Sequence, residues 1–407
     1  MKRQCSRTRT RPAKKLVLWY DTGHALNDIR PLVDRANWLR RDIRMGPISP
    51  IVETGLVKLM KLRFTLVLLF LAAWGVQEAA GQNQVAKIDH EPLDMRFNAV
   101  LDLNYMIRKY GSSKADLPKN IDGFEEAVAV ARQLNTEFGS WLGGGWPAID
   151  AALTKCKNTS EAMQALAQLP ETTTSRQGKT IRVRDAAIRY AKVLNVVEAS
   201  YLKNVAPQHQ TLVAQTNAHL TKIFNRKKST CFSYLSNSLG LGDIQTSIPV
   251  FLVGEAPWPG AFTFWDSTKK GNVVISIEAT PGSMLFETLI HETIHALDLE
   301  NTGTGNILEE IRTRLKNAGL AENDIAVVQG PHLLVFMQAG ETVRRFLDPA
   351  HQHYGEVKGL YHYPGLQPLV KVARPVWMDH LDNKISREEA IKQIVDGFLK
   401  ARKETAP

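Results

Sequence analysis

The stretch that decides the fold covers residues 280–297 and reads TPGSMLFETLIHETIHAL. Thr280 followed by Pro281 is a typical helix start, because a capping residue precedes a proline in the first turn. Apolar residues then recur at helical spacing as far as Leu297, which predicts an amphipathic helix. Within this helix, His291 and His295 lie four residues apart and therefore share one face.

Residues 291–295 read His-Glu-Thr-Ile-His. Two imidazoles one helical turn apart have the spacing that binds one zinc ion, and the intervening Glu292 would face the water that the metal polarises. A lone carboxylate in an apolar stretch is costly without a partner. We therefore predict that His291 and His295 are zinc ligands and that Glu292 is the general base. The alternative is two core histidines on an amphipathic helix.

A catalytic zinc site needs a third protein ligand and an open position for water. We predict Glu341, which follows the apolar first half of a helix expected over residues 333–346. A buried glutamate needs a cation, and zinc would supply one. An ion pair with Arg345 at helical spacing is the alternative. The other residues that compete for the third-ligand position are Asn301, Glu309 and Glu310.

Short apolar runs at residues 248–253, 260–265 and 273–277 predict β-strands before the metal helix. From about residue 94 to 225 the pattern is instead helical. The helices expected in that part cover residues 97–110, 124–138, 160–167 and 183–205. These patterns divide the chain into a helical domain, 82–240, and a metal-binding domain, 241–407.

The chain resembles the zincin metallopeptidases with a gluzincin-type ligand set, in which a carboxylate from a second helix completes the zinc site. Roughly residues 248–400 also resemble a family of exported bacterial zincin-like proteins. The residues that carry this likeness are Pro331-His332, Gly340-Glu341-Thr342-Val343-Arg344-Arg345, Tyr354 and Gly359-Leu360-Tyr361. The resemblance implies an α+β zincin-like fold, mainly helical, with a small mixed β-sheet packed on the metal helix. The arginines at 344 and 345 depart from the best-known gluzincins, which carry an acidic residue shortly after the glutamate ligand.

In zinc peptidases an edge strand lies over the metal helix and hydrogen-bonds an extended peptide, and residues 260–265 or 273–277 could serve that way. Hydrolysis also needs a donor for the oxyanion besides zinc. The candidates are Tyr354, Tyr361 and His332. His332 lies nine residues before Glu341, about 180° around a straight helix, so it would need a kink or a loop to approach the metal.

Other polar residues near the motif receive plainer interpretations. Asp298, about one turn past His295, could orient an imidazole. Three histidines fall in one loop, and we expect them to be solvated rather than to form a second metal site. They are His351, His353 and His362.

The positive charge lies mainly at the front of the chain. Residues 1–81 hold 15 of the 51 lysines and arginines but only 6 of the 41 acidic residues, so they account for +9 of the net charge of +10. The rest is close to neutral, which argues against nucleic-acid binding. Residues 60–81 combine a basic start, an apolar run and small residues, as in a secretory signal peptide. An internal membrane anchor is the alternative.

Residues 1–59 are then interpreted as a mis-called gene start or a disordered extension. Signal cleavage would leave an exported protein, periplasmic or extracellular, without a stable membrane anchor. In such a compartment Cys156 and Cys231 could pair, and the sequence leaves this open. The sequence gives no prediction of the oligomeric state.

Together these features predict a secreted or periplasmic zinc metallopeptidase acting on a peptide or protein substrate. Two other classes remain: a degenerate zincin domain that binds a partner, and an exported helical binding protein whose histidines belong to the core. Metal content and peptide turnover separate the three classes.

Overall fold

The computed structural model describes residues 87–89, 93–140, 143–174, 179–224, 228–241, 247–266, 270–278, 282–300 and 307–405. They form a mainly helical α+β fold with one mixed five-stranded sheet and one two-stranded antiparallel sheet. The predicted fold class, α+β with a small mixed sheet, is confirmed at this level. The predicted extension 1–59 and signal peptide 60–81 lie outside the described residues.

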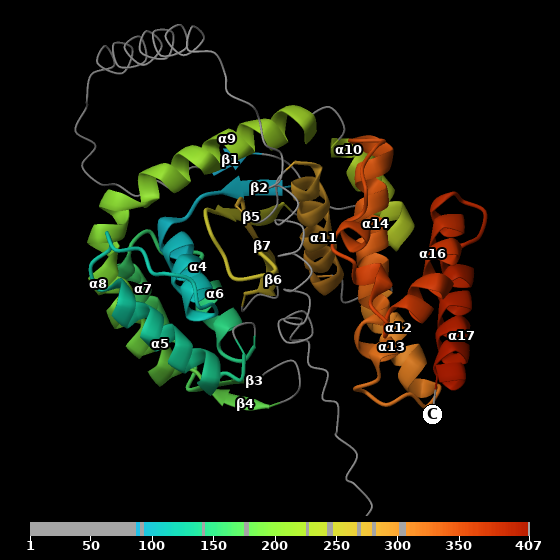
Figure 1. Cartoon of the computed structure of the whole chain (residues 1–407), viewed down its shortest axis with the longest axis horizontal. Coiled ribbons are helices and arrows are strands. Elements are labelled where there is room, and N and C mark those ends of the chain that lie inside the picture. Colours follow the sequence, from blue (N-terminus) through green and yellow to red (C-terminus); the bar gives the residue numbers. More distant parts are fainter. Residues whose placement is uncertain are drawn as a thin grey trace, which may run out of the picture. The chain divides into compact units, whose positions relative to one another are not determined.

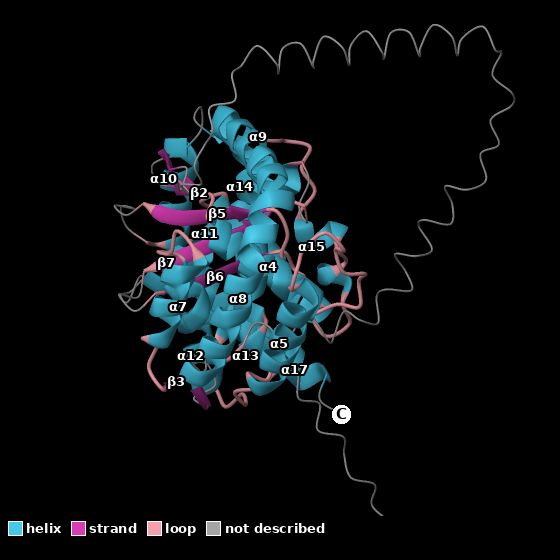
Figure 2. Ribbon diagram, turned by 90° about the vertical axis from the view of Figure 1, so that its left-hand side faces the viewer, coloured by secondary structure: helices cyan, strands magenta, loops and turns pink. Residues whose placement is uncertain are grey.

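The five-stranded sheet has the order β1-β2-β5-β7-β6 (Figure 1). Figure 2 shows β2, β5, β7 and β6 following one another in this order. Strands β2, β5 and β7 are parallel, whereas β1 and β6 run antiparallel to their neighbours. The strands are β1 (Lys87–Asp89), β2 (Leu93–Arg96), β5 (Ile248–Val253), β6 (Ala261–Trp265) and β7 (Gly271–Ser276). All residues of β5 and β7 are buried, as expected for parallel strands covered on both faces.

In Figure 1, helices α4 to α8 of the first half lie on one side of this sheet, whereas α9 runs above it and α10 lies on the other side. These helices are α4 (Ala99–Gly111), α5 (Phe124–Glu137), α6 (Trp146–Leu153), α7 (Thr159–Ala167), α8 (Arg184–Asn204), α9 (Ala206–Phe224) and α10 (Lys228–Leu239). The small strands β3 (Thr172–Thr174) and β4 (Thr180–Arg182) pair within this half. Four of the helices match the predicted ranges to within two residues at each end.

The predicted domains 82–240 and 241–407 share the main sheet. Leu93 of β2 pairs with Ile248 of β5, and the parallel register continues to Arg96 and Phe251. Contacts keep the described residues from 87 to 405 together as one unit. The predicted boundary at residue 240 therefore lies between segments that contribute strands to one sheet.

Helices of the second half follow the sheet, and two of them build the site. They are α11 (Ser283–Glu300), α12 (Ile307–Asn317), α13 (Ile325–Val328), α14 (Gly330–Phe346), α15 (Tyr354–Val357), the 3-10 turn η2 (Leu360–His362), α16 (Gln367–Leu381) and α17 (Arg387–Thr405). Helix α11 packs against β6 and β7 and also against α14. In Figure 1 it lies between the sheet and α14.

Gly271 permits a very close approach of α11 to the sheet. A Cβ atom at this position would lie 2.7 Å from Cβ and 2.8 Å from Cα of Ala296, distances that no side chain could occupy. Ala296 directly follows His295 in α11. The start of β7 therefore fixes how deeply the histidine-bearing turn sits on the sheet.

Cys156 and Cys231 are both buried and are not joined to each other, so the disulfide that the sequence left open is not formed. Burial raises the pKa of the Cys156 thiol to about 11. Within the described residues, no helix has both the length and the apolar character needed to cross a membrane.

Candidate metal centre

Three histidines from two helices converge on one point. Their Nε2 atoms are separated by 3.0 Å between His291 and His332 and by 3.1 Å for each of the two pairs that involve His295. Among the described residues, this is the group of histidine, cysteine and acidic side chains whose geometry could hold a metal ion. His291 is buried, while the other two imidazoles are partly exposed.

The two helices supply these residues in different ways. His291 and His295 occupy successive turns on one face of α11, as their spacing predicts. His332 is the third residue of α14, which begins with Gly330 and Pro331 where a proline suits the first turn. Because α14 packs against α11, its first turn reaches the histidine face without a kink.

Hydrogen bonding alone does not account for three nitrogens at these distances. A neutral imidazole has one N–H, and a nitrogen that donates it has no lone pair left to accept. At least one of the three contacts therefore brings two atoms together without a hydrogen bond. A cation that accepts all three lone pairs would remove this conflict.

The donor set and its dimensions fit a zinc ion. Zinc–imidazole bonds of about 2.0–2.1 Å at tetrahedral angles place ligand nitrogens about 3.3 Å apart. The separations of 3.0–3.1 Å are only a few tenths of an ångström shorter. Three histidines also leave a fourth tetrahedral position for water or substrate, which is the arrangement of catalytic rather than structural zinc sites.

The surroundings keep the imidazole of His291 neutral, which is the form in which histidine binds metals. Burial, together with the neighbouring His332, lowers the pKa of His291 well below its ordinary value. Phe336 packs on this side of the site, with ring centroids 4.2 Å from His291 and 4.8 Å from His332. It lies one turn after His332 and so shares its helix face.

Glu292 is held by the edge strand. The Thr263 hydroxyl of β6 lies 2.7 Å from the Oε2 atom of Glu292 and 2.9 Å from its backbone oxygen. Glu292 is 9% exposed, and its carboxylate therefore lies at the junction of α11 and β6 rather than in bulk solvent. Of the two strands expected to lie over the metal helix, β6 is the one at the sheet edge.

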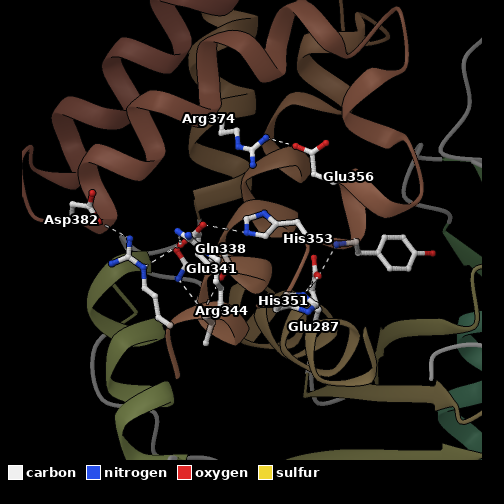
Figure 3. Close-up of polar contacts among 12 residues, drawn as sticks. Glu287, Gln338, Glu341, Arg344, His351, His353, Glu356, Arg374 and Asp382 are labelled. Atoms are coloured by element: carbon white, nitrogen blue, oxygen red, sulfur yellow. Dashed lines mark hydrogen bonds and ion pairs between the residues drawn. The ribbon is translucent and has the colours of Figure 1, made fainter. Parts of the chain in front are cut away.

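The structure does not bring Glu341 to the histidines, and this corrects the predicted third ligand. Its Oε2 atom lies 2.7 Å from Arg344, and its Oε1 atom lies 3.2 Å from Nε2 of His353 (Figure 3). Burial alone would raise the pKa of Glu341, but the bonds from His353 and Arg344 outweigh it and lower the pKa to about 2. The cation that this buried carboxylate requires is thus provided by the protein.

The geometry of α14 explains why His332, and not Glu341, lies beside His291 and His295. His332 and Glu341 are nine residues apart and therefore lie on opposite sides of α14. Only one of them can face α11, and the structure places His332 there. The nine-residue spacing counted against His332 in the sequence. In the structure it places Glu341 on the side of α14 away from the other two histidines. In the sequence, the two arginines shortly after Glu341 indicated the side chains that pair with its carboxylate.

The two predicted tyrosines have different surroundings. Tyr354 stacks on Phe336 with ring centroids 5.9 Å apart and an interplanar angle of 13°. Phe336 in turn contacts His291 and His332. Burial, with Glu287 and Glu292, raises the pKa of Tyr354 to about 12. Tyr361 is 2% exposed, and its described ring contacts are with His353 and Arg374. Neither of these ring contacts is with one of the three converging histidines.

The loop histidines do not form a second cluster, but they are not all solvated as expected. His351 and His353 are buried, and each pairs with a carboxylate of a different helix. His362 is exposed and pairs with Glu356. Gly340 allows His353 to pack closely on α14, because a Cβ atom there would lie 2.5 Å from the imidazole ring.

The remaining candidates do not contribute to the described site. Glu309 is exposed and lies 3.8 Å from Arg312, whereas Glu310 lies 2.7 Å from Arg314. Asn301 and the side chain of Asp298 lie outside the described residues.

No protein-family model, no curated protein and no solved structure matches the chain.

Proposed function

We propose that this protein is a zinc-dependent hydrolase of the metallopeptidase type, with His291, His295 and His332 as zinc ligands. The observation that carries the proposal is the convergence of three Nε2 atoms at 3.0–3.1 Å from two separate helices. The residue next to the first ligand is a glutamate, as a hydrolytic site requires. The ligand set differs from that expected from the resemblance, because an imidazole replaces the glutamate.

A zinc ion bound here would lower the pKa of a coordinated water toward neutrality and polarise the scissile carbonyl. Glu292 accepts the proton of the attacking water and delivers it to the leaving amine. Thr263 orients the Glu292 carboxylate by donating its hydroxyl hydrogen. Three neutral imidazole ligands would leave the full charge of such a metal in place, which would favour ionisation of its bound water at neutral pH.

Strand β6 is suited to bind an extended peptide beside this base. Gly260 and Asp266 form backbone hydrogen bonds to the β7 side, at Ser276 and Lys270. In an antiparallel pair the hydrogen-bonding direction alternates, so the backbone groups of Thr263 point away from β7. A peptide added as a further strand would therefore meet the residue that holds Glu292.

Tyr354 is the preferred donor to the oxyanion. Its pKa of about 12 keeps the hydroxyl protonated at neutral pH, so it can donate a hydrogen bond. The charge of Glu292 contributes to the raised pKa of Tyr354, so the phenol interacts electrostatically with the proposed general base. His332, the third candidate, serves as a ligand instead.

The proposal extends to fold and location. An amphipathic metal helix under a mixed sheet with an antiparallel edge strand supports a zincin-like fold for residues 241–407. The signal-like sequence at residues 60–81 supports export to the periplasm or the extracellular space. The proposed substrate is a peptide or protein.

Metal content and peptide turnover test the proposal together. Protein purified without chelator is expected to contain about one zinc per chain and to cleave members of a mixed peptide library, with products identified by mass spectrometry. The Glu292→Gln variant should keep zinc and lose cleavage. Zinc without cleavage in the wild type would favour a non-catalytic zinc domain, and absence of zinc would favour core histidines.

A further inference from the structure

The segment between α14 and α15 is attached to both helices of the metal centre by buried imidazole–carboxylate pairs. His351 Nε2 lies 2.6 Å from Glu287 Oε2 of α11, and His351 Nδ1 lies 3.0 Å from the Ser283 hydroxyl. On the other side, His353 pairs with Glu341 of α14. Figure 3 shows the two pairs separately, with His351 beside Glu287 and His353 directed toward Glu341.

Glu287 also binds the backbone of the residue that follows these histidines. The backbone N–H of Tyr354 donates to the same Oε2 atom over 2.7 Å. The Tyr354 ring stacks on Phe336, which in turn packs on His291 and His332. A continuous series of contacts thus connects Glu287 through Tyr354 to the histidine cluster.

The position of Glu287 on α11 is not arbitrary. Ser283, Glu287, His291 and His295 follow one another at intervals of four residues and form one stripe along the helix. The first two hold the loop through His351, and the last two belong to the histidine cluster. One helix face therefore holds both the histidine cluster and the segment that leads to Tyr354.

A carboxylate here is costly compared with an apolar residue. The side chains of Glu287 and His351 are 1% and 0% exposed. The Oε1 atom of Glu287 is buried and accepts no hydrogen bond within the described residues. Buried ion pairs often stabilise no more than well-packed apolar side chains of similar volume. What this pair provides beyond stability is a fixed geometry for Tyr354.

We propose that Glu287 and His351 are positioning residues, which hold Tyr354 at the distance from the histidine cluster that its role as an oxyanion donor requires. This inference rests on the proposed function. Glu287 contacts no reacting atom in this scheme and acts only through Tyr354. The Glu341–His353 pair supports the same segment from α14.

A double-mutant cycle in the full chain tests whether Glu287 acts through Tyr354. Glu287→Gln is expected to keep zinc and to lower kcat by about tenfold to 100-fold, as displacement of a catalytic group does, with little change in KM. In the Tyr354→Phe background the same substitution should lower kcat by less than about twofold. Equal losses in both backgrounds would show a general structural effect and overturn the inference.

Hydrogen–deuterium exchange provides a readout that needs no turnover. Glu287→Gln and His351→Asn should both accelerate exchange of the Tyr354 amide and its neighbours in residues 351–357. His362→Asn is the matched control, because its exposed imidazole pairs with Glu356 of α15 rather than with a carboxylate of α11 or α14. Unchanged exchange in both test variants would overturn the inference, even if the wild type proved inactive. An inactive wild type with accelerated exchange would contradict the proposed function and leave the attachment of Tyr354 supported.

Discussion

The Nε2 atom of His332 lies 3.0 Å from that of His291, although 41 residues separate them in the chain. The first belongs to the first turn of α14 and the second to the middle of α11. Their meeting depends on how two helices pack, and not on any local sequence pattern. It also makes His332 the residue on which the proposed zinc site can be tested most directly.

Replacement of His332 by alanine should remove the metal. Loss of one of three protein ligands should weaken zinc binding by more than the roughly 10–100-fold typical of an outer-shell partner. Competition with a chromophoric chelator measures this. His362→Ala, which removes an exposed histidine, should bind zinc like the wild type. Equal affinities of the two variants would remove His332 from the site.

Replacement of Glu341 by glutamine should leave zinc binding intact, because its carboxylate contacts Arg344 and His353 rather than the cluster. Metal analysis of the purified variant checks this. Loss of stoichiometric zinc would restore Glu341 as a ligand and contradict the arrangement described above.

The same substitution should lower the free energy of unfolding in a pH-dependent way. The pKa of Glu341 is lowered from 4.5 to about 2 in the folded chain, so its carboxylate stabilises the fold above pH 4.5. This contribution, on the order of 2 kcal/mol for hydrogen bonds to a charged group, is lost as the pH falls toward 2. Urea unfolding of both proteins at pH 7 and pH 3 should show a smaller difference at pH 3. A constant difference would contradict it.

Thr263→Val should reduce turnover while keeping the metal. The substitution preserves the shape of the side chain but removes the hydroxyl that donates to Glu292 Oε2. Loss of a hydrogen bond of about 1–2 kcal/mol predicts a roughly 5- to 30-fold fall in kcat/KM. Thr263→Ser, which keeps the hydroxyl, is the control and should retain most of the activity. Similar losses in both variants would point to packing rather than orientation of the base.

Gly271→Ala should destabilise the fold and weaken zinc binding. The added methyl would lie 2.7 Å from Cβ of Ala296 and would push α11 away from β7. Such overpacking costs about 1–3 kcal/mol, measurable as a lower urea midpoint. A second substitution, Ala296→Gly, should restore part of the loss, since it removes the nearest clashing atom. If the double variant were no more stable than the single one, the close contact would not be the cause.

The sequence allowed much of this fold to be predicted where local patterns decide the structure. The run at residues 248–253 gives β5 with the predicted bounds, and the apolar period after residue 280 gives α11. Strand β2 was not predicted, because four residues carry little periodicity and their pairing partner, β5, lies far along the chain. The sheet therefore joins segments that differ in composition.

The candidate site was predicted only in its local part. The spacing of His291, Glu292 and His295 is fixed by one helix and therefore visible in the sequence. The choice between His332 and Glu341 depends on which side of α14 faces α11, and helical periodicity shows only that they cannot both do so. The arginines at 344 and 345, which pair with Glu341, would have favoured His332 over Glu341 as the residue that faces α11.

The four-residue stripe on α11 has a consequence for how this helix can change in length. Inserting or deleting one residue between Glu287 and His291 would rotate one half of the stripe by about 100° relative to the other. The histidines and the loop attachment would then face different neighbours, although every functional side chain would still be present. The segment from Ser283 to His295 should therefore tolerate substitutions at positions without a proposed role far more readily than the insertion or deletion of one residue.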